Sequence, residues 1–546
     1  MKAAALAASC LTVSCLVGGP LAAPLSAQGQ WVTPQAPCDI RPGHFKVNGG
    51  ILYLKTAAEK PTQRDQQLEQ ARRVLTEAII QNDQGKNPAA WYYLGRYYFE
   101  ANDAVGADSA FSRAVALAPP CGQDIDGYRQ RLWATTLNAG LAAWQEGRAD
   151  SAAVLFHLAS RLQPGNPKAL IALAGLFASE DKYDSALVYY RRTAEAAGND
   201  TAFERDKREA LGNAARILFG RAQNDPAAQQ YGRLRQRVDS IERALANDST
   251  VLARMIASAQ SRKARGRRLA PADQQTFTKD STARTQAVVQ AKAARAAVLQ
   301  QIAADSVQLR SAYAPAIEAL RAYLAAYPGA IDAATSLATL YAQSGRAAEA
   351  TAVFDTIAAH AQSLDPEALF AAGQRLSSQG LFEAGTRAFA VGLQKNPYRR
   401  DALYALGVGY YQLRDSANLL PVAQRLAALD PLNRASIKLV AAAWDLRGQR
   451  DSTLKYVARA DSGIAVELTV SSFLPDSGGA AITLLATNLK PAPSKPFQLT
   501  VEFLDPRGQV VVSATRDVPA ISPRDKSQID LKVSGKGIAG WRYRGS

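Results

Sequence analysis

The chain has 546 residues, of which 47% are hydrophobic and 21% are charged, and this composition excludes a predominantly disordered protein. Its length suits three or four average domains or one extended repeat array. The formal net charge of +16 favours contact with anionic surfaces but says nothing about the fold.

The first residues have the organisation of an export signal. One Lys precedes an apolar run that ends in small residues, so we expect a signal peptide over residues 1–27, cleaved after Ala27. The mature protein would then be periplasmic, outer-membrane-associated or secreted. Two alternatives stay open. A membrane anchor is disfavoured because Gly-Gly-Pro interrupts the run. A lipoprotein is disfavoured because the residues three positions before Cys10 and Cys15 are Ala and Thr, not Leu.

Residues 28–59 are expected to form an extended N-terminal arm. Once the signal peptide is removed, Cys38 and Cys121 are the only cysteines, and an exported chain with two cysteines favours one disulfide bond. The bond would close a loop of some eighty residues and stabilise the fold by about 4 kcal/mol. It would also tie the arm to the first repeat junction. The alternative is two unpaired thiols.

The segment 87–120, "NPAAWYYLGRYYFEANDAVGADSAFSRAVALAPP", carries two sets of apolar residues at helical spacing. Small residues stand where two helices must approach closely, and aromatic residues fill the space between helix pairs. A proline ends the second helix, since proline cannot continue it. The residues concerned are Trp91, Leu94, Gly95, Tyr98, Ala107, Phe111, Ala114 and Pro119.

With these eight positions the unit resembles a tetratricopeptide repeat. Similar units, near a 34-residue step, start at Trp133, Pro167, Ile331, Pro366, Arg400 and Arg434. Degenerate units are expected before Asn87 and after Asn199. The resemblance implies a mainly α solenoid of stacked helical hairpins, in an N-terminal array over 60–227 and a C-terminal array over 315–462.

Residues 228–314 interrupt the repeats with two long, polar, helix-favouring segments. We expect a long, coiled-coil-like helical hairpin. Apolar residues of its first helix would pair with those of its second: Leu234, Val238, Ile241 and Leu245 with Val288, Val289, Val298 and Ile302. Its tip is basic, with Arg262, Lys263, Arg265, Arg267 and Arg268. This patch could meet anionic lipid headgroups or envelope polymers, or simply be a solvated tip.

Residues 463–546 differ in character. Runs rich in β-branched and aromatic residues are separated by Gly, Pro, Asn and Asp, which predicts about six or seven short strands in a small antiparallel sandwich. The region resembles bacterial immunoglobulin-like domains of the FxLYD type. Asn488, Asp505 and Gly508 take positions of that motif, while Leu504 replaces its usual Tyr.

No constellation of catalytic residues stands out. The chain has three histidines, His44, His157 and His360, and neither a paired CxxC, an HExxH nor a phosphate-binding glycine loop. We therefore expect no enzyme activity, no cofactor and no metal. Nucleic acid is not an expected partner, because no aromatic residues interleave the basic run.

Binding is the leading predicted function. In tetratricopeptide proteins, set positions of the first helix of each pair line a concave groove that suits an extended peptide or a partner helix. Carried over to this sequence, they are Tyr92, Arg96, Phe99, Leu137, Trp144, Phe370, Gln374, Tyr404 and Tyr411. The alternative is that some of these side chains pack within the array.

Three functional hypotheses follow. The first is a non-enzymatic exported scaffold or adaptor that binds a protein or peptide partner in cell-envelope assembly or organisation. The second is binding of an envelope polymer or an anionic lipid surface through the basic tip or the β domain. The third, disfavoured, is an enzyme with dispersed catalytic residues.

Overall fold

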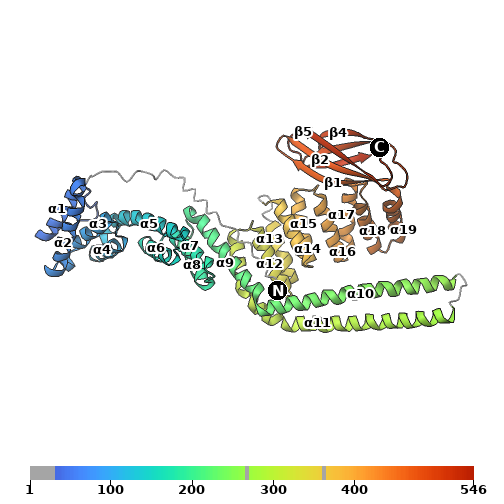
Figure 1. Ribbon diagram of the computed structural model, residues 1–546, viewed down its shortest axis with the longest axis horizontal. Coiled ribbons are helices and arrows are strands. Elements are labelled where there is room, and N and C mark those ends of the chain that lie inside the picture. Colours follow the sequence, from blue (N-terminus) through green and yellow to red (C-terminus); the bar gives the residue numbers. More distant parts are fainter. Residues whose placement is uncertain (1–30, 265–269, 359–363, 546) are drawn as a thin grey trace. The chain divides into compact units, whose positions relative to one another are not determined.

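The computed structural model describes residues 31–264, 270–358 and 364–545 (Figure 1). These residues form helix pairs, two long helices and a small C-terminal β region, which confirms the mainly α fold class predicted with that accessory region. The predicted signal peptide lies outside the described residues.

The chain divides between Asp206 and Lys207 into two compact units, here called unit 1 and unit 2. Within the described residues, no helix combines the length and apolar character needed to span a bilayer.

Unit 1 consists of successive helix pairs, each packed against the next in the sequence. Their bounds are α1 Phe45–Glu59 and α2 Arg64–Gln81, α3 Pro88–Glu100 and α4 Ala104–Leu117, α5 Gly122–Gln145 and α6 Ala149–Leu162, and α7 Lys168–Ser179 and α8 Tyr183–Ala197.

The arm expected to be extended over 28–59 is shorter than predicted, because residues 45–59 form helix α1. This helix buries Val47, Leu54 and Ala57 in a core shared with α2. A Cβ on Gly50 would lie 2.5 Å from the Leu75 side chain of α2. The buried positions 47, 50, 54 and 57 follow helical spacing, so this helix was readable from the sequence.

Close approach within the pairs explains the glycine of the repeat. A Cβ on Gly95 of α3 would lie 2.5 Å from the Phe111 ring of α4, and a Cβ on Gly140 would lie 2.6 Å from the ring of Phe156. The same relation joins Gly373 to Phe389 in unit 2, at 2.9 Å. The glycine therefore gives each phenylalanine ring its place between the two helices.

Unit 2 begins within the first turn of α9, Glu204–Asn224, and continues through two long helices into further helix pairs. The long helices are α10 Pro226–Ala264 and α11 Pro271–Ala326. The pairs are α12 Ile331–Gln343 and α13 Ala347–Ala358, α14 Pro366–Ser378 and α15 Phe382–Lys395, α16 Arg400–Gln412 and α17 Ser416–Leu429, and α18 Arg434–Leu446 and α19 Arg450–Ala458.

The long helices α10 and α11 form the predicted hairpin (Figure 1). Leu234, Val238 and Val298 are buried between them, and Ile241, Leu299 and Ile302 pack against this group. We call this apolar contact between α10 and α11 the seam. Val289, expected in the seam, is instead 61% exposed, because it falls on the outer side of α11. Ion pairs Arg284–Asp248 and Arg295–Glu242, each at 2.7 Å, flank the seam. The base of α11 enters the core of the helix pairs through Tyr313, Ile317 and Leu320.

Of the six or seven strands predicted, the described β region contains six: β1 Val466–Pro475, β2 Gly479–Asn488, β3 Phe497–Leu504, β4 Val510–Val518, β5 Lys526–Ser534 and β6 Gly540–Gly545. They form two antiparallel sheets, in the orders β1-β2-β5 and β4-β3-β6. Alternate residues of β2 and β3, such as Leu484 and Val501, are buried in one shared core. Asn488 is buried too, and its amide nitrogen donates to the carbonyl oxygens of Ala492 and Ile521 at 2.8 and 2.9 Å.

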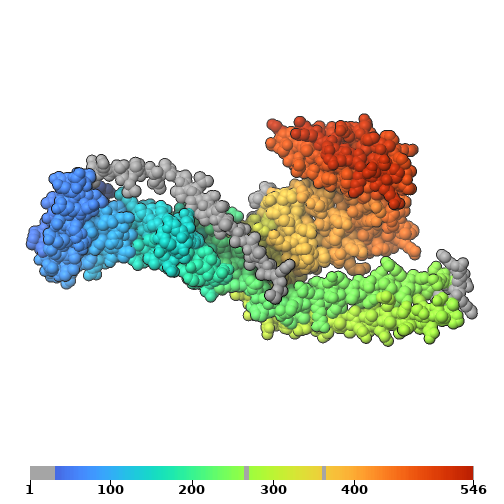
Figure 2. Space-filling view, in the orientation of Figure 1, coloured from blue at the N-terminus to red at the C-terminus, as the bar shows by residue number. Residues whose placement is uncertain are grey.

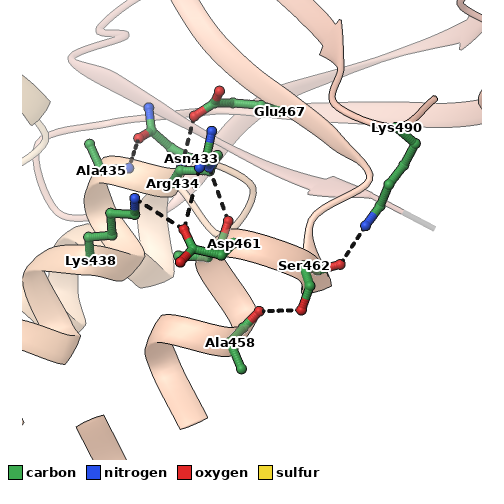
Figure 3. Close-up of polar contacts among 10 residues, drawn as sticks. Asn433, Arg434, Ala435, Lys438, Ala458, Asp461, Ser462, Glu467 and Lys490 are labelled. Atoms are coloured by element: carbon green, nitrogen blue, oxygen red, sulfur yellow. Dashed lines mark hydrogen bonds and ion pairs between the residues drawn. The ribbon is translucent and has the colours of Figure 1, made fainter. Parts of the chain in front are cut away.

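The β region is fastened to the last helix pairs, and Figure 2 shows it, in red, in contact with them. Arg434 at the start of α18 donates from its backbone to Glu467 of β1 at 3.1 Å. Its side chain and that of Lys438 both reach Asp461, at 3.4 and 3.1 Å (Figure 3). Lys490 donates to the Ser462 carbonyl at 2.7 Å. These contacts fix the β region against α18.

Candidate functional site

Four of the predicted groove residues, Tyr92, Arg96, Tyr404 and Tyr411, lie on two helix faces that differ in exposure, and each face includes one further residue, Tyr93 or Val408. We call the group on α3, Tyr92, Tyr93 and Arg96, the α3 face. We call the group on α16, Tyr404, Val408 and Tyr411, the α16 face. The α3 face lies in unit 1 and the α16 face in unit 2, and each is the side of a first helix of a pair.

Residues 31–38 of the same chain cover Arg96 and Tyr93 of the α3 face. The Arg96 guanidinium carbon lies 4.1 Å from the centre of the Trp31 ring, within cation–π distance. Arg96 also donates to the carbonyl oxygen of Val32 at 2.5 Å. The Trp31 ring stacks on Tyr93, with centroids 6.1 Å apart. Arg96 is only 7% exposed as a result.

The first turns of α5 hold the same segment from its other end. Asp124 accepts a hydrogen bond from the backbone nitrogen of Gln35 at 3.1 Å and another from the Tyr92 hydroxyl at 2.5 Å. Burial, with this bond to Asp124 contributing, raises the pKa of Tyr92, so its phenol stays a neutral donor. A disulfide bond joins Cys38 to Cys121, immediately before α5.

Helix α5 begins at Gly122, eleven residues before the expected repeat start at Trp133. This extension brings Asp124 and Tyr128 against α3, and Tyr128 packs on Phe99 and Phe111 at 5.1 and 5.5 Å. The repeat pattern starts only at Trp133 and does not include this extension. A helical spacing of Ile125, Tyr128 and Leu132 was the available signal.

Several predicted groove residues are therefore not open to a partner in this structure. Tyr92 is fully buried, and Arg96 is covered by the chain's own N-terminal segment. Leu137 and Phe370 are buried in the helical cores, the latter beside Gly392. Tyr92, Leu137 and Phe370 thus pack within the array, whereas Arg96 is covered by residues 31–38.

Two further predicted residues are half-buried. Phe99 packs edge-on against Tyr128. Trp144 meets Phe156 edge-on and covers Gly175, where a Cβ would lie 3.1 Å from the indole. Both rings fill the space between neighbouring helices, so only part of each remains accessible.

The α16 face is open. Tyr404 is 42% exposed and Tyr411 40% exposed, and the half-buried Val408 lies between them on the same side of the helix. Gln374, on the preceding first helix α14, is also exposed. Helices α14, α16 and α18 contact one another in that order. They thus present a continuous row of first helices with exposed tyrosines at its middle.

A pocket of about 930 Å³ lies elsewhere, between α4, α5 and α6. At its edge the buried Asp108 carboxylate accepts a hydrogen bond from Arg161 at 2.8 Å and pairs with Arg129 at 3.7 Å. Arg129 also donates to Ser112 at 2.8 Å. Because both arginines already engage Asp108, this cluster serves to join three helices.

The remaining candidate residues have structural roles or lie outside the described residues. His44 caps α1 by accepting from the Lys46 backbone nitrogen at 3.3 Å. His157 packs against Tyr189, and burial together with Arg192 lowers its pKa. His360 lies outside the described residues. Among the residues described, no group of His, Cys, Asp and Glu could hold a metal ion.

Only part of the basic tip lies within the described residues. Arg262 is exposed near the end of α10. The side chain of Lys263 and the whole of Arg265, Arg267 and Arg268 lie outside the described residues. The tip therefore stays a prediction from the sequence.

Comparison with known proteins supports the repeat. Residues 143–205 match the tetratricopeptide repeat family model. No curated protein matches the chain.

Solved structures with some similarity include MamA, at 21% identity over 29% of this chain and 91% of that chain, with a TM-score of 0.19. Pseudomonas aeruginosa PilF shows 12% identity over 56% of this chain and 96% of its own, with a TM-score of 0.24. Yeast Tom70 shows 12% identity over 70% and 93%, with a TM-score of 0.18. None of these similarities identifies a partner or an activity.

Proposed function

We propose that this protein is a non-enzymatic scaffold that binds an extended segment of a protein partner across the α16 face. The supporting observation is the pair of tyrosines, Tyr404 and Tyr411, that α16 leaves exposed on one side. Their counterparts in unit 1 are covered by the chain itself. Tetratricopeptide repeats are protein-binding modules, so an open first-helix face is the place where a partner is expected.

The chemistry of the α16 face suits a peptide. Tyrosine rings offer large, rigid contact area with a polar tip, at little cost in side-chain entropy. Val408 adds an apolar contact between them, and Gln374 on α14 can both donate and accept hydrogen bonds with a partner's backbone. A segment with apolar side chains spaced along an extended backbone would fit this arrangement.

We place this scaffold in the cell envelope or outside the cell. The proposal rests on the signal-peptide features of residues 1–27 and on the disulfide bond between Cys38 and Cys121. Such bonds persist in oxidising compartments, which include the bacterial periplasm.

Site-specific photocrosslinking in the native host tests the binding face. A photoreactive amino acid is placed at Tyr404 or Tyr411, and in the control at Gln424, an exposed position on α17, the second helix of the same pair. We expect discrete protein adducts from the two tyrosine positions and not from Gln424. The adducts are identified by mass spectrometry.

The double substitution Tyr404→Ala and Tyr411→Ala then measures the contribution of the rings. Truncating an aromatic anchor costs roughly 1–2 kcal/mol or more, so affinity for the crosslinked partner should fall at least about tenfold. Gln424→Ala should leave it unchanged. Equal adducts from all three positions, or unchanged affinity in the double variant, would remove the α16 face as the binding site.

A further inference from the structure

The segment over the α3 face is held by contacts of the kind a bound peptide makes. Its one aromatic ring, Trp31, lies between a guanidinium and a phenol. Toward the helices, its backbone donates from Gln35 to Asp124 and accepts at Val32 from Arg96. Residues 31–35 belong to no helix or strand. One ring and two backbone hydrogen bonds thus carry the recognition.

The receiving groups are built into the helices. Arg96 and Tyr93 project from α3, and Asp124 is positioned by its hydrogen bond with the buried Tyr92 hydroxyl. Arg96 also lies 5.6 Å from the centre of the Tyr128 ring, which supports its guanidinium from α5. A guanidinium, an aromatic wall and a carboxylate acceptor are therefore supplied by α3 and α5 and not by residues 31–38.

Because the disulfide bond tethers residues 31–38 to the start of α5, weak non-covalent contacts are enough to keep this segment on the α3 face. The disulfide bond fixes Cys38 beside the start of α5, so Trp31 acts from a tether of seven residues. A tether this short gives an effective concentration in the millimolar range, and the segment stays in place even with a weak intrinsic affinity. A partner segment with the same chemistry could then compete for the site when the tether is open.

We propose that the α3 face and the first turns of α5 form a peptide-binding site for an extended segment with a tryptophan. In this structure the chain's own residues 31–38 occupy it. The site lies in unit 1, so it goes beyond the proposed function of the α16 face and does not depend on it. Arg96 and Tyr93 contact the indole through cation–π and stacking interactions. Asp124 and Arg96 form hydrogen bonds with the ligand backbone.

Disulfide trapping tests the site in the full chain. The variant Trp31→Ala, Cys38→Ser removes the ring and the tether and leaves the Cys121 thiol free. The probe is the peptide WVTPQAPC, the sequence of residues 31–38, supplied as a mixed disulfide with thionitrobenzoate. Attack by the Cys121 thiolate on the peptide sulfur releases thionitrobenzoate and leaves the peptide bound. Intact-mass and peptide mapping measure its capture against rising 2-mercaptoethanol.

The matched probe is AVTPQAPC. We expect the tryptophan peptide to resist about tenfold more reductant than the alanine peptide, since a desolvated cation–π contact contributes up to about 2 kcal/mol. Adding Arg96→Gln should narrow the difference between the two peptides to what the Tyr93 stacking contributes. Adding Cys121→Ser should abolish capture. Equal capture of both peptides in the parent variant, or no capture at Cys121, would overturn the proposal.

A second measurement uses the unmodified protein and does not depend on the variants folding. Chymotrypsin cleaves after Trp31, which is half-buried in the oxidised protein. On reduction of the disulfide, we expect cleavage at Trp31 to accelerate about tenfold while hydrogen exchange of α3 stays slow. Cleavage that appears only together with exchange of α3 would show that residues 31–38 are part of the core and not a displaceable occupant.

Discussion

Gly95 shows how one residue sets the spacing of a helix pair. A Cβ there would come within 2.5 Å of the Phe111 ring, which is fully buried and cannot move outward. Overpacking of this kind costs about 1–3 kcal/mol. We expect Gly95→Ala to lower the unfolding free energy of unit 1 by that amount in urea denaturation.

Gly49 provides the matched control for this substitution. It lies inside α1, and beyond the neighbouring residues and backbone of its own helix no atom stands within 4 Å of where its Cβ would be. Gly49→Ala should therefore stabilise by about 0.5–1 kcal/mol through helix propensity alone. Equal effects of the two substitutions would show that the Phe111 contact is not what requires glycine.

The Arg400 side chain makes several interactions at the junction between the helix pairs and the β region. It is buried, donates to Asp430 at 3.0 Å and to the Trp541 carbonyl at 2.6 Å, and lies 3.4 Å from the centre of the Trp541 ring. Burial lowers the pKa of Arg400, and the Asp430 carboxylate opposes this shift. Arg400→Ala would leave Asp430 buried without its partner.

Breaking a buried ion pair in this way costs about 3–5 kcal/mol. We expect Arg400→Ala to show this loss in urea denaturation followed by tryptophan fluorescence. Arg399→Ala, the adjacent exposed arginine with ion pairs to Glu367 and Asp401, should cost less than about 1 kcal/mol. A similar loss in both would mean that the buried network contributes little.

At the scale of elements, the long hairpin depends on a narrow apolar seam. Val298 is buried between α10 and α11, whereas Val289, nine residues earlier on α11, is exposed. We expect Val298→Asp to increase hydrogen exchange along α10 and α11, because a carboxylate would be buried without a partner. Val289→Asp should leave exchange unchanged. The reverse pattern would mean that the hairpin pairs through the other side of α11.

The ion pairs of Asp461, which precedes β1, with Arg434 and Lys438 of α18 should make the stability of this contact depend on pH. A hydrogen bond from Lys438, with further attraction from Lys438 and Arg434, lowers the pKa of Asp461 below its usual 3.8 (Figure 3). The folded state then holds its proton less tightly than the unfolded state. The stabilisation is fully present above about pH 3.8 and is lost as the pH falls through the lower, folded pKa.

Melting temperatures of the wild type and of Asp461→Asn between pH 2 and pH 6 test this sign. The wild type should melt higher at pH 6, and the difference should shrink as the solution becomes more acidic. In a Lys438→Met background the difference at pH 6 should also be smaller. A difference that grows toward low pH would contradict the assignment.

At the scale of the whole molecule, the scaffold and the surface-binding hypotheses make separable predictions. Deleting residues 262–268 removes the basic tip and leaves the helix pairs in place. If the protein is a scaffold, this deletion should preserve the partner crosslinks from Tyr404. Binding to vesicles containing anionic lipid, measured by sedimentation at low and high salt, should be equally weak with and without the tip.

A loss of salt-sensitive vesicle binding in the deletion variant, with crosslinks unchanged, would instead favour the anionic-surface hypothesis. A loss of the crosslinks would show that the tip acts on the partner itself. The two readouts together therefore assign the tip to one of the two roles.

The sequence by itself determined the helix pairs and the six strands. Both follow from contacts between residues that are near in the chain, such as Gly95 with Phe111, and such contacts leave a period in the sequence. Strand alternation in β2 and β3 works the same way. The hairpin was also predictable, but its register was not, because a polar helix with few apolar residues allows more than one seam, as Val289 shows.

Only the tertiary structure decided which first-helix faces are free. Tyr92 and Tyr404 occupy equivalent repeat positions, yet the first is fully buried and the second is 42% exposed. Tyr92 is covered by Asp124 and Tyr128 from the early extension of α5. Residues 31–38 then cover the neighbouring Arg96, which Val32 reaches across 64 positions of sequence. A contact at that distance leaves no periodic trace, since it depends on where the folded helices hold their side chains and not on the local pattern that forms them.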